Sequence, residues 1–325
     1  MLVRTLVTCL LLLITTAGVA QTTTSEQTPK LLLRHKLATV TTNDLDSFAR
    51  DYSRWLNYEV RERGRVPRGL AASWGAPKPA GKRYVLLSPD TAPDVYLRAV
   101  ETQATTDYRP LTTWGWNSIE IVVDKPDALH ATLTDSPFKT IGSPAPLGAY
   151  PSIRAFQVVG PSNEVLYLTA ETGDRSKSPL PEPGGAVGRI FIMVVAGPDI
   201  EKMRAFYAQA FKLESGPARQ VPVRVVQNAL GLPSDAAIGL TTARLAEHGN
   251  LLELDGYPAS TGARQHAEGT LPPGIALVSF EVRDLDAIEL EFISPPRRQP
   301  GQAYAGKRVA TAIGAAGELI ELIER

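Results

Sequence analysis

One short pattern occurs four times along the chain, and this repetition constrains the fold more than any single residue does. In two of the copies an Asp-apolar-acidic triplet is followed, eight residues after its first Asp, by a tyrosine, Tyr52 or Tyr207. Each copy follows a strand-like run and precedes a second apolar strand. The four motifs lie at 44–46, 123–127, 199–201 and 284–286. A unit of this size, used repeatedly, predicts an array of similar structural modules.

Each unit is predicted to fold as β-α-β-β-β, and the third unit shows this most clearly. Residues 189–195 form a continuous β-rich apolar run, typical of a strand buried on both faces. Asp199 is a suitable N-cap for a helix whose apolar residues recur at helical spacing. The unit closes on the apolar strand 251–254, which is followed by a Gly-Tyr-Pro turn at 256–258.

These motifs resemble the vicinal oxygen chelate superfamily, which includes glyoxalase I, extradiol ring-cleaving dioxygenases, methylmalonyl epimerase and bleomycin-binding proteins. The segments that carry the resemblance are TVTTNDLDSFARDYSRWLNYEV (39–60), MVVAGPDIEKMRAFYAQAFKLE (193–214), LVSFEVRDLDAI (277–288) and GAAGELIELIE (314–324). The resemblance implies an α+β fold of four βαβββ modules, paired into two glyoxalase-like domains with curled mixed sheets. The modules lie near 33–103, 112–172, 187–258 and 272–325. Such a resemblance identifies architecture better than activity.

The division of the chain follows from composition. Residues 1–20 have a basic residue near the start, an apolar run and small residues at the end, which predicts a secretory signal peptide. The stretch 173–186 is polar and contains Pro and Gly, which predicts a linker. Modules one and two would then form an N-terminal domain, 33–172, and modules three and four a C-terminal domain, 187–325. We expect an exported protein, periplasmic or secreted.

Charge and cysteine content exclude several kinds of partner and chemistry. The single cysteine, Cys9, lies in the predicted signal peptide, so thiol catalysis and disulfides are excluded from the mature chain. The 34 basic and 34 acidic residues balance and form no basic cluster, which argues against nucleic acid as a partner. No other segment approaches membrane-spanning length. We expect a small-molecule ligand, and a monomer or homodimer.

The resemblance implies two metal-ligand positions in each module, commonly His on the first strand and Glu on the last. Counting along the first strands gives Leu37, Ser118, Ile190 and Leu277, and aligning the last strands gives Arg98, Tyr167, Glu253 and Glu321. The four histidines, His35, His130, His248 and His266, occupy no equivalent pair of positions. An oxygen-activating metal would need two imidazoles and a carboxylate. No metal site is therefore predicted, although two carboxylates could hold a divalent ion weakly.

Glu253 and Glu321 are the predicted catalytic residues. If modules three and four pair, both carboxylates line one cleft, where burial and mutual repulsion would raise one pKa and create a general base for enolisation or isomerisation. The structural alternative is that each carboxylate is satisfied by an Arg or a backbone N–H group. Pro295 and Pro296 argue against a full helix in module four, so the cleft beside Glu321 is expected to be open.

Arg98, Tyr167, Trp114 and Trp116 are the predicted substrate-binding residues. Arg98 would hold a carboxylate or enolate through its fork of donors, and Tyr167 would add a hydroxyl donor. The two tryptophans could form a ring-stacking wall. The structural alternatives are an Arg98 paired with Glu101 or Glu120, and tryptophans that belong to the core.

Three functions remain open from the sequence. The first is lyase- or isomerase-type enolate chemistry on a small, largely apolar oxygenated molecule, without histidine metal ligands. The second is metal-free binding of a small molecule, as in bleomycin-resistance proteins. The third is a metal-dependent glyoxalase or dioxygenase.

Overall fold

The computed structural model describes residues 29–103, 107–148 and 150–325, so the predicted signal peptide, 1–20, lies outside the described residues. Module one comprises β1 (Leu32–Thr42), α1 (Leu45–Leu56), β2 (Tyr58–Arg65), α2 (Arg68–Ser73), β3 (Arg83–Pro89) and β4 (Tyr96–Glu101). Module two comprises β5 (Thr113–Val123), α3 (Pro126–Leu133), β6 (Lys139–Leu147), β7 (Tyr150–Val159) and β8 (Val165–Glu171). The 3₁₀ helix η1 (Arg175–Lys177) follows.

The second half repeats the plan. Module three comprises β9 (Val187–Gly197), α4 (Ile200–Phe211), β10 (Arg219–Val221), α5 (Arg224–Leu230), β11 (Ile238–Arg244) and β12 (Leu251–Gly256). The two-residue strand β13 (Gly262–Ala263) precedes module four, which comprises β14 (Ile275–Val282), β15 (Arg297–Arg298), β16 (Arg308–Ile313) and β17 (Leu319–Glu324). The segment between β14 and β15 contains no helix, as the paired prolines predicted.

The aspartates of the repeated motif start the main helices. The Asp199 side chain accepts a hydrogen bond from the backbone N–H of Lys202 at 3.1 Å, which confirms its predicted role as N-cap of α4. Asp44 caps α1 in the same way through the N–H of Ser47 at 2.9 Å. Both helices end at a residue in the left-handed conformation. The repeat in sequence is thus a repeat in local structure.

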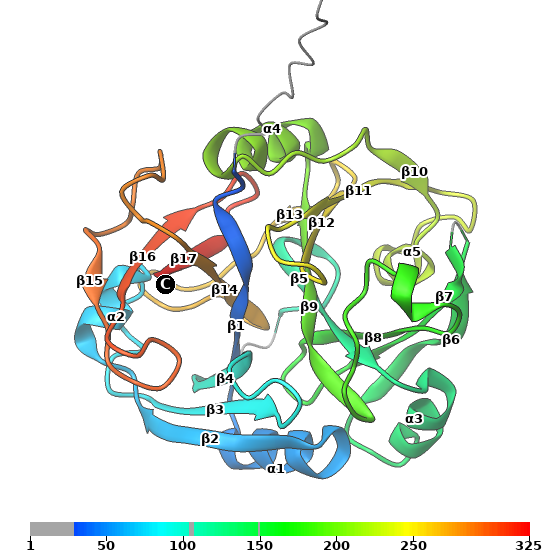
Figure 1. Ribbon diagram of the computed structural model, residues 1–325, viewed down its shortest axis with the longest axis horizontal. Helices are drawn as coiled ribbons and strands as arrows, with labels where there is room; N and C mark the ends of the chain where they lie inside the picture. Colours follow the sequence, from blue (N-terminus) through cyan, green and yellow to red (C-terminus); the bar gives the residue numbers. More distant parts are fainter. Residues whose placement is uncertain (1–28, 104–106, 149) are drawn as a thin grey trace, which may run out of the picture.

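The four modules form two curled mixed sheets, which lie side by side in Figure 1. Sheet one has the order β15-β16-β17-β14-β1-β4-β3-β2, and sheet two has the order β10-β11-β12-β9-β5-β8-β7-β6, with β13 beside β5. Module one therefore pairs with module four, and module two with module three. The prediction that modules one and two share one sheet, and modules three and four the other, is wrong.

The pairing follows from the antiparallel contacts of the four first strands. In sheet one β1 pairs with β14, and in sheet two β5 pairs with β9. All four strands are almost entirely buried, and strands of this kind accept a partner along either edge. The linker 173–186 thus joins two neighbouring modules of the same sheet.

One apolar core joins the outer faces of both sheets to α1, α3 and α4. Two buried hydrogen bonds cross it at equivalent places. The hydroxyl of Tyr52 donates to Glu164 at 2.8 Å, and that of Tyr207 donates to Glu318 at 2.7 Å. The tyrosine that lies eight residues after Asp44 or Asp199 thus connects the helix of one module to the turn before the last strand of the next.

Candidate functional site

The concave faces of the two sheets carry the residues that correspond to one another between modules. The last-strand residues lie directly beside first-strand residues in the parallel ladders, and the pairs are Thr39 with Arg98, Glu120 with Tyr167, Val194 with Glu253 and Ser279 with Glu321. The first-strand positions predicted from the sequence, Leu37, Ser118, Ile190 and Leu277, lie two or four residues too early. Counting residues back from the Asp motifs therefore does not predict which first-strand residue lies beside each last-strand residue.

The sheet pairing separates the two predicted catalytic residues. Glu253 lies on β12 in sheet two, and Glu321 lies on β17 in sheet one. The expectation that they line one cleft is wrong. Arg98 and Tyr167 are separated in the same way, so Arg98 shares a concave face with Glu321 and Tyr167 shares one with Glu253.

On sheet one the Glu321 carboxylate is fully enclosed and saturated with donors. It receives hydrogen bonds from the indole N–H of Trp74 at 2.7 Å, from the hydroxyl of Ser279 at 2.5 Å and from that of Tyr304 at 3.1 Å. None of the Glu321 side chain is exposed to solvent. The expectation of an open cleft beside it is therefore wrong, because Trp74, directly after α2, fills that space.

Arg98 belongs to the same network. Its guanidinium donates to the hydroxyls of Thr39 at 2.8 Å and Tyr304 at 2.6 Å, and it lies over the ring of Trp74. Burial lowers the pKa of Arg98, but Tyr304 and Glu321 outweigh this and the net shift is upward. The partners expected for a structural Arg98, Glu101 or Glu120, are not the ones observed. Because both charges are satisfied internally, neither Arg98 nor Glu321 is free to bind a substrate.

On sheet two, by contrast, three carboxyl groups share a concave face with few partners. Glu120 on β5 and Glu253 and Asp255 on β12 form this acid cluster. The hydroxyl of Thr169 donates to Glu120 at 3.1 Å, whereas Glu253 accepts no hydrogen bond from any described group. Glu253 is partly exposed, and Glu120 and Asp255 are buried. The acid cluster therefore combines buried charge with a route to solvent.

Burial changes the acidity of all three groups. It raises the pKa of Glu253 to about 7. Burial together with the charge of Glu253 raises the pKa of Glu120 well above its usual range, which the Thr169 hydroxyl partly offsets. Burial and the charges of Glu253 and Glu120 raise the pKa of Asp255 in the same direction. Near neutral pH, Glu253 can thus exchange a proton, while burial shifts Asp255 toward its protonated form.

Unpartnered polar atoms gather on the same strands. Six buried side-chain N or O atoms among the described residues lack a hydrogen-bond partner, and four of these belong to β5 or to the end of β12. The four are Asn117 Nδ2, Ser118 Oγ, Asp255 Oδ1 and the hydroxyl of Tyr257. Buried polar atoms are ordinarily paired with protein or water, so an orphaned group in a native fold calls for a water or a ligand.

An apolar cover lies over the acid cluster. Val225 and Val226 of α5 join Tyr167 and Tyr257 in one apolar cluster, to which Trp114 adds its ring. The Trp114 indole donates to the hydroxyl of Thr261 at 2.7 Å. Tyr167 and Trp114 thus belong to this apolar cluster, and their role in substrate binding stays a prediction.

Trp116, the fourth predicted substrate-binding residue, lies elsewhere. Its side chain packs in the main core between the sheets, and its indole N–H donates to the backbone carbonyl of Leu319 at 2.8 Å. The ring-stacking wall of two tryptophans is therefore not formed, because an irregular register between Trp116 and Ser118 interrupts the alternation of faces along β5.

Neither face offers the imidazole ligands that an oxygen-activating metal would need, although the carboxyl groups on sheet two could hold a divalent ion weakly through oxygen. On sheet one the only carboxylate at the four corresponding positions is Glu321, and the Arg98 cation would repel a metal ion. On sheet two the positions hold Glu120, Tyr167, Val194 and Glu253, without imidazole. In the part of the chain that the structure describes, no three His, Cys, Asp or Glu side chains gather as a metal site.

Two residues of the acid cluster were not recognised in the sequence as site residues. Glu120 lies two residues beyond the predicted first-strand position, and the alternation of β5 would have placed it on the same face as Ser118. Asp255 follows Glu253 by two residues and shares its face for the same reason. The alternation of side chains between the two faces of a strand is the sequence feature that predicts both positions.

The overall architecture matches known structures at low sequence identity. Glyoxalase I from Zea mays is 16% identical with a TM-score of 0.59, and the match covers 90% of this chain and 92% of that one. A mutant of the same maize enzyme has a TM-score of 0.61 at 15% identity, covering 90% and 93%. A putative dioxygenase from Bacillus subtilis is 12% identical with a TM-score of 0.59, covering 91% and 86%. The chain has the glyoxalase fold.

The glyoxalase fold confirms the predicted α+β class, the four modules and the curled mixed sheets, although module four lacks the helix of a βαβββ unit. No protein-family model and no curated protein matches the sequence. Among the described residues no helix is both long and apolar enough to cross a membrane. The glyoxalase fold does not determine which reaction, if any, takes place on either sheet.

Proposed function

We propose that this glyoxalase-fold protein binds a small, largely apolar oxygenated molecule on sheet two and moves a proton on it, as an isomerase or lyase. The observation that best supports this proposal is the pKa of the Glu253 carboxyl, which is about 7. A group with this pKa can both remove and return a proton at neutral pH. The proposal includes export, with residues 1–20 acting as a signal peptide.

The roles within the acid cluster follow from its different acidities. The ionised Glu253 would take a proton from a carbon next to a carbonyl group. The Asp255 carboxyl in its protonated form, which burial favours by raising the pKa, and the unpartnered Tyr257 hydroxyl would donate hydrogen bonds to the developing enolate oxygen. With an α-hydroxyketone, the hydroxyl proton of the substrate would pass to the enolate oxygen, and Glu253 would return its proton to the former carbonyl carbon, so that the carbonyl group moves to the neighbouring carbon. The cover formed by α5 and Trp114 would exclude water while the enolate exists.

Glu321 has no part in this proposal, although the sequence predicted a catalytic role for it. Its oxygens are already occupied by Trp74, Ser279 and Tyr304. It serves instead as the matched control, since it is the corresponding residue on the other sheet.

Deuterium exchange at carbon tests the proposal without knowledge of the substrate. Small ketones and hydroxyketones are incubated with the protein in D₂O, and loss of the α-proton signal is followed by NMR. We expect enzyme-dependent exchange with some members of the panel, a loss of at least 100-fold in Glu253→Gln, and little change in Glu321→Gln once folding is verified. Exchange that persists in Glu253→Gln would refute the assigned role.

Binding without turnover is the second candidate, favoured by the four unpartnered atoms on or next to β5 and β12, the strands that carry the acid cluster. Compounds that raise the thermal midpoint but undergo no exchange would support it. The third candidate, metal-dependent chemistry, predicts a stoichiometric divalent ion by mass spectrometry and a lower midpoint in EDTA. We expect neither a stoichiometric ion nor a lower midpoint in EDTA, because imidazole ligands are missing at the corresponding positions of both faces.

A further inference from the structure

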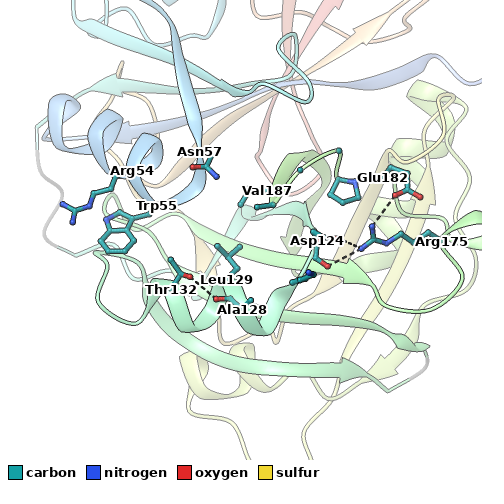
Figure 2. Close-up of a pocket in the computed structure, with 15 residues that line it drawn as sticks. Arg54, Trp55, Asn57, Asp124, Ala128, Leu129, Thr132, Arg175, Glu182 and Val187 are labelled. Carbon is teal, nitrogen blue, oxygen red and sulfur yellow. Dashed lines mark hydrogen bonds and ion pairs between the residues drawn. The ribbon is translucent and has the colours of Figure 1, made fainter.

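A cavity of about 780 Å³ lies outside both concave faces, where three distant segments meet. These are the end of α1, the junction of β5 with α3, and the end of the linker. Figure 2 shows Trp55 at one end of the cavity and Arg175 at the other, with Val187 and Leu129 between them. None of its lining residues belongs to the acid cluster or to its cover.

One end of the cavity is apolar and aromatic. Trp55 and Leu129 are partly buried and pack against the main core, so their positions are fixed while part of each remains accessible. The guanidinium of Arg54 lies 4.9 Å from the centre of the Trp55 ring. Arg54 therefore covers one face of the indole, and the apolar surface of Trp55 and Leu129 that remains accessible suits a flat apolar group, which gains by leaving water.

The charges around the cavity favour an anion. Its lining includes three cations, Arg54, Lys125 and Arg175, and two anions, Asp124 and Glu182. Both anions are engaged by Arg175, at 2.8 Å and 3.6 Å. Among the described residues, neither Arg54 nor Lys125 forms an ion pair, so the cavity has a net positive charge and two cations to offer.

The end of the linker forms the third side of the cavity. Gly184, in this segment, has φ +68°, and a Cβ there would lie 3.0 Å from Thr91, so a side chain at this position would be both strained and crowded. A volume of this size is within the range of about 300–1,000 Å³ found for small-molecule sites.

We propose that this cavity is a second ligand site, which takes a small organic anion with a flat apolar body, of the aromatic carboxylate class. The apolar body lies against Trp55 and Leu129, and the carboxylate lies near Lys125. The site is independent of the proposed proton-transfer chemistry on sheet two.

The test uses 2-naphthoate, titrated into the mature protein at low salt and followed by calorimetry and by tryptophan fluorescence. We expect saturable binding of one equivalent and quenching of Trp55. Lys125→Glu should weaken binding at least tenfold, whereas Lys139→Glu, an exposed lysine outside the cavity, should change it less than twofold. The uncharged analogue 2-naphthalenemethanol should bind at least tenfold more weakly than 2-naphthoate.

A second variant, which fills part of the cavity, keeps the test valid if Lys125→Glu fails to fold. Ala128 is exposed on α3 and lines the cavity, and Ala128→Glu both fills space and adds negative charge at a helical position that tolerates Glu. We expect it to abolish binding while the thermal midpoint is kept. Binding that survives both cavity variants, or no saturable binding up to millimolar 2-naphthoate, would overturn the proposal. Glu253→Gln should leave this binding unchanged, which separates this site from the one on sheet two.

Discussion

At the scale of single residues, Arg98 was predicted to bind substrate but forms part of a buried hydrogen-bond network instead. Its charge is buried and shared through Tyr304 with Glu321. Removing one member of such a network leaves the other charge buried and uncompensated, at a cost of about 3–5 kcal/mol. We therefore expect Arg98→Met to lower the free energy of unfolding by about that amount in urea denaturation.

The control for Arg98 is Arg63, whose pair with Asp46 is exposed at 3.2 Å. Because exposed pairs contribute about 0–1 kcal/mol, Arg63→Met should change stability by less than 1 kcal/mol. Equal effects of the two substitutions would mean that the network around Arg98 is not what stabilises this face.

Glu253 gives a residue-scale prediction with a definite sign. Burial raises its pKa from 4.5 to about 7 in the folded protein. Below pH 4.5 both states hold the proton. Between 4.5 and 7 the unfolded state loses it first, so stability falls as pH rises through this window. We expect Glu253→Gln to remove about 1–3 kcal/mol of that fall, measured by urea denaturation between pH 4.5 and 8.

A residual fall is expected in Glu253→Gln, because burial also raises the pKa of Glu164 to about 7. The exposed Glu289 supplies the control, and Glu289→Gln should leave the pH profile as it is in the parent. A Glu253→Gln profile that coincides with the parent would show that Glu253 does not titrate near neutrality, and would remove the support for its role as a base.

At the scale of elements, the two buried tyrosine bonds make the repeat testable. Tyr52 to Glu164 and Tyr207 to Glu318 are equivalent contacts between a helix and the turn before the last strand of the next module. Each Tyr→Phe change removes one donor from a buried carboxyl and should cost about 1–3 kcal/mol. The sites are distant and share no partner, so the double variant should be additive within about 0.5 kcal/mol. Clearly unequal single effects in urea denaturation would contradict structural equivalence.

Some of these structural elements can be predicted from the sequence, whereas the pairing of the strands cannot. Asp199 as helix cap, the apolar face of α4 and the missing helix of module four are local, since each depends on residues within a few positions. The pairing of β1 with β14 and of β5 with β9 is not local. All four strands are buried on both faces, and nothing in their composition selects a partner. The faces of Glu253 and Glu321 were inferred correctly, but their grouping depended on that pairing.

At the scale of the whole molecule, the strand order predicts how the halves of the chain depend on each other. Each sheet draws one module from residues 29–172 and one from 173–325. Either half alone would leave the apolar first strands β1 and β5, or β9 and β14, without their antiparallel partners. Exposed edges of this kind lead to aggregation.

We therefore expect neither half, expressed separately, to give a soluble species with cooperative thermal unfolding. Expressed together, the two halves should associate into a one-to-one complex with the circular dichroism of the intact chain, since the break at 172–173 falls outside every strand. The uncut protein is the control for both measurements. If residues 29–172 alone unfold cooperatively as a monomer, the two-module domains 33–172 and 187–325 would be real folding units, and the sheets would have to form by exchange between them.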